Sequence, residues 1–470
     1  MMMVRGAYCH PKGTVKSKII APRSAVSHEC LLRDKNLLEQ QQEQHVSGCA
    51  CLRIQHIETM EYVSIDDVYS AYYSCRKHKR NTQGAMAYEL DYERNNYKLY
   101  TDLNNMTYEV GRSIAFCVTR PKLREVFAAD FRDRVVHHLI MQRFMTIFEA
   151  HMIDSSYNCR KGKGTLYGVR DIYGKIKAIS ENWTQETYAL KFDIQGFFMS
   201  IDKKLLYSKV ADIVKTSATK NKDWWLWLIR KVIMHRPQHN CEIRGDSALW
   251  NKLPKHKTLL EKEDDKGMAI GNLTSQVFAN LFLSDFDRWI CSQLGKNEGY
   301  GRLTDDCAII SRSKSKLLRL LSDARKRLTD IGLTLHPHKV YLQEVTKGLP
   351  FIGSAIKPSR IYTQHRTIDN MYAMIRAWNA DKRPNTARYI CRYNSYSGFL
   401  VHTQSYGIRC RVWELVENKN NIKNINNKYI KYDIRKSTNQ KGRLSGYSHK
   451  RRKAHHTYQS NGNRRSDRVR

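Results

Sequence analysis

Two adjacent aspartates, Asp305 and Asp306, separate two short apolar segments. Residues 301–304 and 307–310 predict strands, so the Asp-Asp pair falls in the tight turn of a β-hairpin. Folding alone disfavours this choice, because neighbouring carboxylates repel each other and such a turn prefers Asn-Gly. An isolated Asp-Asp turn is most often a solvated loop. A bound divalent cation gives a physical reason to keep both carboxylates in this place.

The net charge of the chain indicates which kind of molecule it binds. The 470 residues include 81 Lys and Arg against 45 Asp and Glu, a net charge of +36. This excess predicts a polyanionic partner, nucleic acid before membrane; the alternative is a soluble basic or ribosome-associated protein. No apolar run approaches the roughly 18 residues of a membrane helix, and the N-terminus lacks the apolar core of a secretory signal. We therefore expect a cytoplasmic protein without a membrane partner.

Periodic patterns along the chain predict a mixture of helices and strands. Ser200 is the predicted cap of a helix whose apolar positions are Leu206, Val210, Ile213 and Val214. The other predicted helices cover 66–75, 88–100, about 130–150, 278–289, 313–331 and most of 366–416. Strands are predicted within 116–127, 188–194 and 335–356.

Five motifs over roughly residues 115–360 occur in the order found in reverse transcriptases, which this part of the chain resembles. They are LKFDIQGFFMSID at 190–202, GMAIGNLTSQ at 267–276, YGRLTDD at 300–306, GLTLHPHK at 332–339 and KGLPFIG at 347–353. In that order they look like the first palm motif, the nucleotide-side motif, the aromatic-x-Asp-Asp box, the fourth palm motif and the primer-grip turn. The resemblance implies an α/β (α+β) right-hand polymerase, with fingers, a palm whose antiparallel sheet is backed by helices, and a helical thumb.

The same resemblance implies an RNA-directed DNA polymerase, a nucleotidyltransferase, with Asp193, Asp305 and Asp306 as its catalytic residues. They would hold two Mg²⁺ ions, for which Mn²⁺ can substitute, with Ile194 as a further metal contact. One ion activates the primer hydroxyl, and the other holds the triphosphate and the leaving pyrophosphate. One departure is Leu303, which stands where the family places an aromatic ring. We expect it to alter packing beside the template or the nucleotide rather than catalysis.

The resemblance implies contacts with the incoming nucleotide for two cations at the tip of the fingers and for the aromatic ring of Phe198, five residues after Asp193. It implies further contacts for residues of the motifs at 267–276 and 332–339. Phe198 would be the steric gate that excludes a ribose 2′-hydroxyl; the alternative is a core ring beside Phe197. The fingertip cations, with Arg120 among them, could instead be solvated surface. The implied nucleotide-binding residues are Lys122, Arg124, Phe198, Ile270, Gly271, Ser275, Gln276 and Lys339.

Contacts with template and primer are implied by a second fingers motif and by the primer-grip turn. Residues 156–165, SYNCRKGKGT, resemble that fingers motif, and their glycine-spaced cations suit backbone approach to template phosphates. The implied partners are a template RNA, the RNA–cDNA hybrid and dNTPs. The implied contact residues are Arg160, Lys161, Lys163, Lys347 and Gly348.

A finer resemblance rests on residues 270–276, IGNLTSQ, where most reverse transcriptases have Gln before the Gly and Pro after the Ser. An aliphatic residue followed by Gly-x-x-x-Ser-Gln resembles the enzymes of diversity-generating retroelements, as do residues 124–138 and 154–164. Those enzymes copy a template-repeat RNA into cDNA, misincorporate opposite adenines, and work with a small basic pentameric accessory protein. Phage-defence (abortive-infection) reverse transcriptases share the Ser-Gln feature and are one alternative. A non-catalytic RNA-binding protein on a polymerase fold is another.

The composition and the resemblance together predict five parts of the chain. Residues 418–470 contain sixteen Lys and Arg against two Asp, and we expect this basic tail to be disordered in isolation. The parts are an N-terminal extension at 1–63, fingers and N-terminal region at 64–187, a palm at 188–360 with a fingers insertion at about 215–265, a thumb at 361–417, and the tail.

Overall fold

The computed structural model of the chain describes residues 61–77, 79, 82–119 and 122–417. Every element below belongs to one compact unit, which includes residues 62–417. The predictions for residues 1–60, for the basic tail and for Arg120 lie outside the described residues. Within the described ranges, no helix has the length and apolar character needed to cross a membrane.

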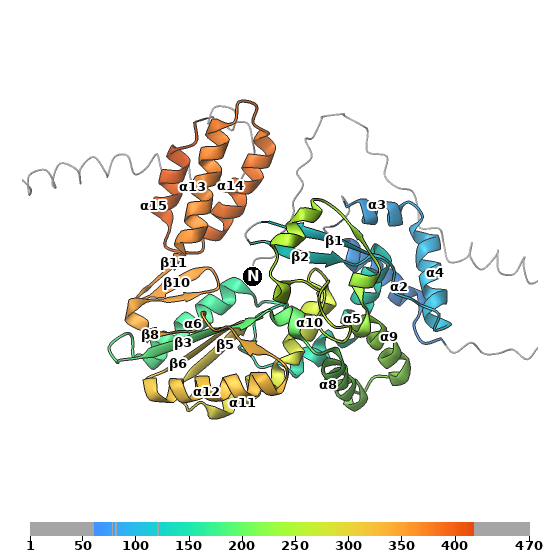
Figure 1. Cartoon of the computed structure of the whole chain (residues 1–470), viewed down its shortest axis with the longest axis horizontal. Helices are drawn as coiled ribbons and strands as arrows, with labels where there is room; N and C mark the ends of the chain where they lie inside the picture. Colours follow the sequence, from blue (N-terminus) through green and yellow to red (C-terminus); the bar gives the residue numbers. More distant parts are fainter. Residues whose placement is uncertain (1–60, 78, 80–81, 120–121, 418–470) are drawn as a thin grey trace, which may run out of the picture. The chain divides into compact units, whose positions relative to one another are not determined.

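A five-stranded antiparallel sheet carries the three predicted catalytic aspartates. The strand order is β5-β6-β3-β7, and β8 also pairs with β3. Strands β5, β6, β3 and β8 run side by side in Figure 1. The strands predicted at 188–194 and on both sides of the Asp pair are confirmed. Their bounds are β3 Tyr188–Gln195, β5 Gly299–Leu303, β6 Asp306–Ser311, β7 Thr334–Leu335 and β8 Tyr341–Glu344.

Helices back both faces of this sheet, because successive strand side chains point to opposite sides. Phe192 and Ile309 join a core that also contains apolar residues of α11 and α12, whereas Ala308 and Ile310 join a core with α6. The predicted basic helix at 313–331 is confirmed as α12, and the hydroxyl of Ser313 caps it by accepting from the Lys316 amide. The three helices are α6 Thr165–Ile179, α11 Ser284–Gln293 and α12 Lys314–Asp330.

A second, three-stranded sheet contains the predicted hairpin at 116–127. Strand β4, from the predicted insertion at 215–265, pairs in parallel with β1. The insertion is also tied to β2 by the buried Glu125 carboxylate, which accepts hydrogen bonds from the Trp250 indole, the Thr258 hydroxyl and the Leu259 amide. The strands are β1 Ser113–Val118, β2 Arg124–Ala128 and β4 Cys241–Ile243.

The helices before and after this sheet agree with the predictions at 66–75 and 130–150 and correct two others. The predicted helix at 88–100 is two helices, separated at Leu90, whose side chain is exposed. The predicted buried helical face at 278–289 spans two helices, α10 and α11. The helices are α2 Ile65–Arg76, α3 Gln83–Glu89, α4 Tyr92–Asn104, α5 Phe131–Ala150, α7 Phe197–Ser200, α8 Lys203–Thr216, α9 Lys222–Met234 and α10 Leu273–Phe282.

The prediction that Ser200 caps the helix after β3 is wrong. Its hydroxyl donates to the Gly196 carbonyl at 3.2 Å, because a short helix, α7, comes first and ends at Ser200. The actual cap is Asp202, whose carboxylate accepts from the Leu205 amide at 2.9 Å. The helix therefore begins two residues later, with its predicted apolar positions still buried.

The C-terminal described region contains a small sheet and three helices. The prediction of strands within 335–356 and of helices over most of 366–416 is confirmed. Trp378, Tyr393 and Trp413 pack in a separate core formed by the three helices. The elements are β9 Leu349–Phe351, β10 Ser354–Lys357, β11 Arg360–Thr363, α13 His365–Ala380, α14 Thr386–Leu400 and α15 Tyr406–Glu414.

Candidate active site

The β5–β6 hairpin presents the Asp pair beside the third aspartate. Leu303 and Asp306 are the last paired residues of the hairpin, so Thr304 and Asp305 form its two-residue loop. On the other side of β6, Asp306 pairs directly with Asp193 of β3. Asp193 of β3, Asp306 of β6 and Asp305 of the loop before β6 therefore lie close together, and their catalytic role stays a prediction.

The loop has an unusual backbone at Thr304. Its φ of 62° lies in the left-handed region, which a β-branched residue rarely adopts and which Gly usually supplies in tight hairpins. The side chain is only 1% exposed. Strained backbone of this kind costs about 1–3 kcal/mol and persists only where the surroundings enforce it.

The surroundings of the hairpin carboxylates oppose their ionisation. Burial, with the negative charges of Asp193 and Asp306, raises the pKa of Asp305 to about 6. Burial also raises the pKa of Asp306, although the Lys191 ammonium lowers it. The side chains of Asp193 and Asp306 each keep 19% exposure, so solvent still reaches them. A bound cation would relieve this concentration of negative charge.

Two lysines already neutralise part of that charge. The Lys339 ammonium lies 2.5 Å from a carboxylate oxygen of Asp193, and the Lys191 ammonium lies 3.0 Å from one of Asp306. Within the part of the chain that the structure describes, no three His, Cys, Asp or Glu side chains are grouped closely enough to hold a metal ion. The hard oxygen donors fit Mg²⁺ in kind and in charge, but both lysines compete with a metal for them.

Ile194, predicted as a further metal contact, is almost fully buried in β3 and pairs with Leu335 of β7. Its apolar side chain cannot ligate Mg²⁺, so any contact would come from its main chain, and that role stays a prediction. Leu303, which replaces the usual aromatic ring, is 2% exposed and packs into the core that contains α6.

The predicted fingertip cation Lys122 lies within electrostatic reach of other cations and of Asp193. Partial burial lowers the pKa of Lys122, and the positive charges of Lys339, Arg366 and Arg124 lower it further, while the negative charge of Asp193 raises it. Lys122, just before β2, therefore lies within electrostatic reach of Lys339, after β7, and of Arg366 in α13. Cations gathered in this way suit a triphosphate.

The predicted nucleotide-side motif lies against β2. The Ile270 carbonyl accepts from the Phe127 amide at 3.0 Å. Gly271 has a φ of +129°, and a Cβ there would lie 2.9 Å from Val126. The close approach of the two segments therefore requires glycine. Ser275 is 3% exposed, near the start of α10, and the Gln276 amide oxygen accepts from the Cys159 thiol.

Phe198 is 6% exposed and belongs to the largest hydrophobic core, with its ring centroid 5.5 Å from that of Phe197. This burial favours the core alternative that the sequence left open, and the steric-gate role stays a prediction that needs its own test.

The predicted template cations differ in how far they reach solvent. Arg160 donates to the carbonyls of Ile153 and Ser156 at 2.6 and 3.1 Å and is 9% exposed, so its guanidinium is largely used inside the protein. Lys163 pairs with Asp154 at 2.5 Å and is 13% exposed. Lys161 is exposed and therefore the best placed of the three to meet a phosphate.

In the predicted primer-grip turn, Lys347 is exposed, whereas Gly348 is buried with a φ of 100°. The Gly348 carbonyl accepts from the Tyr341 hydroxyl at 2.8 Å and from the Gln343 amide at 2.5 Å. These bonds fix the turn and leave the Lys347 ammonium free to extend toward a phosphate.

The sequence reasoning missed Lys191 and Arg302. Lys191 lies two residues before Asp193 on β3, hence on the same face of the strand, which is a signal that could have been found. The partner of Arg302 is Asp287, fifteen residues earlier on α11, and no local pattern indicates that pairing.

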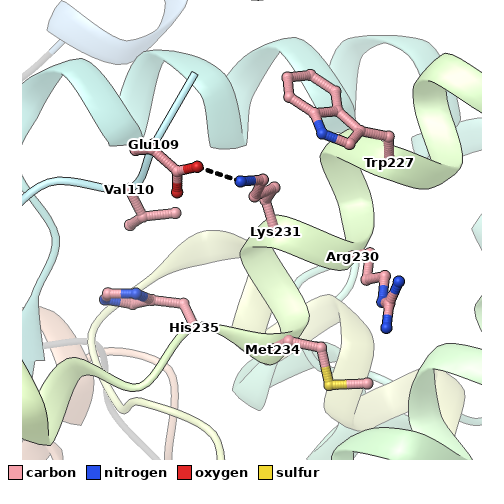
Figure 2. A pocket seen from close by; sticks show the side chains of 7 residues that line it. All are labelled: Glu109, Val110, Trp227, Arg230, Lys231, Met234 and His235. Carbon is pink, nitrogen blue, oxygen red and sulfur yellow. Dashed lines mark hydrogen bonds and ion pairs between the residues drawn. The ribbon is translucent and has the colours of Figure 1, made fainter. Parts of the chain in front are cut away.

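A separate surface hollow of about 360 Å³ lies beside the C-terminal end of α9 (Figure 2). The Lys231 ammonium pairs there with the Glu109 carboxylate. None of the residues predicted for metal, nucleotide or template lines it, so it lies apart from the predicted catalytic residues. Its lining residues are Glu109, Val110, Trp227, Arg230, Lys231, Met234 and His235.

An Asp-Asp hairpin paired to a third aspartate, on an antiparallel sheet backed by helices, is the arrangement of a template-directed polymerase palm. The family model of the reverse transcriptases (RNA-dependent DNA polymerases) matches residues 120–356, half of the chain. The chain belongs to the reverse transcriptase family, and its mixed α/β fold is the right-hand polymerase fold.

Solved structures similar to the chain include three telomerases. Apo telomerase from Candida tropicalis is 11% identical over 67% of this chain and 59% of its own, with a TM-score of 0.42. A form of it truncated from the C-terminal domain is 12% identical over 54% of this chain and 55% of its own, with a TM-score of 0.39. Telomerase from Candida albicans in complex with a TWJ fragment of telomeric RNA is 11% identical over 67% of this chain and 56% of its own. Its TM-score is 0.39. The chain thus spans little more than half the length of these structures, and similarity this low carries no argument about substrate. No curated protein matches the chain.

Proposed function

We propose that the chain is an RNA-directed DNA polymerase that extends a primer by two-metal phosphoryl transfer. The observation that carries this proposal is the direct cross-strand pairing of Asp193 with Asp306, next to Asp305 and its raised pKa, on a chain of the reverse transcriptase family. Carboxylates kept together against their repulsion suit a site for hard cations.

The two Mg²⁺ ions, when bound, would polarise the primer hydroxyl and stabilise the leaving pyrophosphate. The other steps fall to side chains of this chain. Lys122 and Arg124 hold the incoming triphosphate by charge-assisted hydrogen bonds. Lys339, now paired with Asp193, exchanges that carboxylate for phosphate oxygens once the nucleotide and metals enter. Lys191 holds the Asp306 carboxylate in place through their ion pair.

Extension of oligo(dT) on poly(rA) with dTTP and Mg²⁺ tests the proposal. We expect extension that stops when a chelator removes the metal. Binding of the RNA without extension, under both Mg²⁺ and Mn²⁺, would contradict the proposal and favour a non-catalytic RNA-binding protein on this fold.

We further propose that the enzyme serves a diversity-generating retroelement, copying a template-repeat RNA with errors opposite adenine, together with a small basic pentameric partner. Support comes from residues 270–276, because Ile270 offers no side-chain hydrogen bond where related enzymes place Gln. Sequencing cDNA made on a defined RNA tests this. Errors concentrated at template adenines are expected, and an even error spectrum would favour the phage-defence alternative.

The same proposal divides the described chain into three parts: fingers up to about residue 187, a palm at 188–360 with the insertion at about 215–265, and a thumb at 361–417. It places the enzyme in the cytoplasm. The antiparallel pairing around β3 and the separate core of the three C-terminal helices support the palm and thumb boundaries.

A further inference from the structure

Arg302 and Asp287 form an ion pair with no solvent exposure in the core beneath the catalytic loop. The guanidinium donates from Nε and Nη2 to the two carboxylate oxygens, at 2.8 and 2.6 Å. Burying two charges costs several kcal/mol per ion, and a well-packed apolar pair is often as stable. Stability alone therefore does not explain the pair, and its other contacts indicate what it does.

The third arm of the guanidinium reaches the catalytic loop. Nη1 of Arg302 donates to the Thr304 carbonyl at 2.7 Å. Thr304 is the residue with the left-handed backbone, and the next residue is Asp305. A strained peptide relaxes unless it is held. The Arg302 side chain is the charged donor that holds this peptide, while Asp287 fixes the guanidinium from the other side.

The main chain of Arg302 is joined to the second fingers motif. Its amide donates to the Ser155 carbonyl at 2.9 Å, and its carbonyl accepts from the Tyr157 amide at 2.9 Å. The segment that carries Arg160 and Lys161 is therefore hydrogen-bonded to the edge of the catalytic hairpin.

Helix α10, which carries Ser275 and Gln276, joins the same network. The Asn280 side-chain amide donates to the Asn158 carbonyl at 2.7 Å, and its oxygen lies 3.4 Å from Nη1 of Arg302. Three segments with separate predicted roles, for template, nucleotide and metal, thus meet at one buried guanidinium.

We propose that Arg302 is a positioning residue of the polymerase: it clamps the Thr304–Asp305 loop in the geometry that chemistry requires and fixes that loop to the fingers segment 155–158. The inference rests on the proposed polymerase function. It adds a residue that touches neither substrate nor metal and acts through the main chain of Thr304.

Arg302→Lys tests the clamp while preserving the positive charge. A single ammonium cannot keep both bonds to Asp287 and the bond to the Thr304 carbonyl. We expect a folded protein whose single-turnover rate of dTMP addition falls about 10²-fold, as for a misplacement of about 1 Å. The Kd for primer–template should stay within about twofold. Mn²⁺ affinity, followed by electron paramagnetic resonance, should weaken, and amide hydrogen exchange at 303–307 should accelerate.

Arg312→Lys is the matched control, because Arg312 follows the far end of β6 and also donates to a carbonyl, Ile179, and to a carboxylate, Glu181, each through one arm. It should leave rate, Mn²⁺ affinity and exchange at 303–307 unchanged. If Arg302→Lys does not fold, the double variant Arg302→Met with Asp287→Asn removes both buried charges together. The Asn oxygen still accepts from the Tyr300 hydroxyl that now bonds Asp287.

A wild-type rate together with wild-type exchange at 303–307 in a folded variant would overturn the clamp. So would an equal loss in Arg312→Lys. If the wild-type protein does not extend primers at all, the proposed function fails. The exchange and Mn²⁺ measurements then still decide whether Arg302 holds the loop.

Discussion

Gly301, on strand β5, permits a close contact between the second fingers motif and the catalytic hairpin. A Cβ at this position would lie 2.1 Å from the Tyr157 hydroxyl oxygen, 2.8 Å from Cζ of the same ring and 2.9 Å from Cδ1 of Ile172. The ring cannot retreat easily, because Gly168 lies against it: a Cβ there would be 2.6 Å from Cδ2 of Tyr157. Gly301→Ala must therefore displace a fully buried tyrosine.

The cost of this displacement has two parts. Overpacking a tight core costs about 1–3 kcal/mol. The Tyr157 hydroxyl also donates to the Asp171 carboxylate at 2.5 Å, and losing a hydrogen bond to a charged group costs about 1.5–3 kcal/mol. Together we expect the free energy of unfolding to fall by roughly 2.5–6 kcal/mol. The melting temperature should fall by roughly 3–6 °C, because a chain of this length loses about 1 °C per kcal/mol.

Thermal unfolding followed by circular dichroism measures this change, with Gly174→Ala as the control. Gly174 lies inside α6, next to the same hairpin, and a Cβ there would meet nothing within 4 Å. Alanine in a helix interior should stabilise the protein by about 0.5–1 kcal/mol. The two Gly→Ala changes should thus move the melting temperature in opposite directions. If Gly301→Ala melts within about 1 °C of the wild type, Tyr157 does not pack against β5 as described.

Ile270→Gln restores a hydrogen-bonding side chain beside the nascent pair, so misincorporation opposite adenine should fall more than opposite other bases; an unchanged error spectrum places the infidelity elsewhere. Phe198→Ala should admit ribonucleotides if the ring is a steric gate. If instead the ring only fills the core, the variant should lose about 3–5 kcal/mol of stability without gaining ribonucleotide incorporation. Deleting residues 418–470 removes sixteen cations and should flatten the dependence of log K on log salt for RNA binding; an unchanged slope means that the tail does not contact the RNA.

The features that the sequence predicted best are those that local periodicity determines. The apolar residues on each side of Asp305 and Asp306 predict both strands. The turn lies one residue earlier than predicted, at Thr304 and Asp305, because Asp306 pairs with Leu303 as the first residue of β6. The helix after Ser313 follows from its cap and its spacing of apolar residues. The motif order then places Asp193 on a third segment, and the pairing of β3 with β6 brings it beside Asp306.

Features that depend on tertiary partners were not predictable in this way. Ser200 and Asp202 can both cap a helix, and only the intervening short helix α7 decides between them. Arg160 looks like a phosphate-binding cation in sequence, but the fold turns it toward the Ile153 and Ser156 carbonyls. In the sequence, nothing distinguishes Arg302 from the other cations of this basic protein. Its role depends on its ion pair with Asp287, which lies on helix α11.

The most direct test of the account is the single-turnover rate of the first dTMP addition on an RNA template by Asp305→Asn and Asp306→Asn. Asp323→Asn, on the exposed side of α12, is the control for removing one negative charge. Each hairpin variant loses one anionic oxygen donor while keeping its shape. We predict rates several orders of magnitude below the wild type for both, with RNA binding retained and the control unaffected. A rate close to wild type in either hairpin variant would contradict the assignment of these aspartates as the catalytic carboxylates.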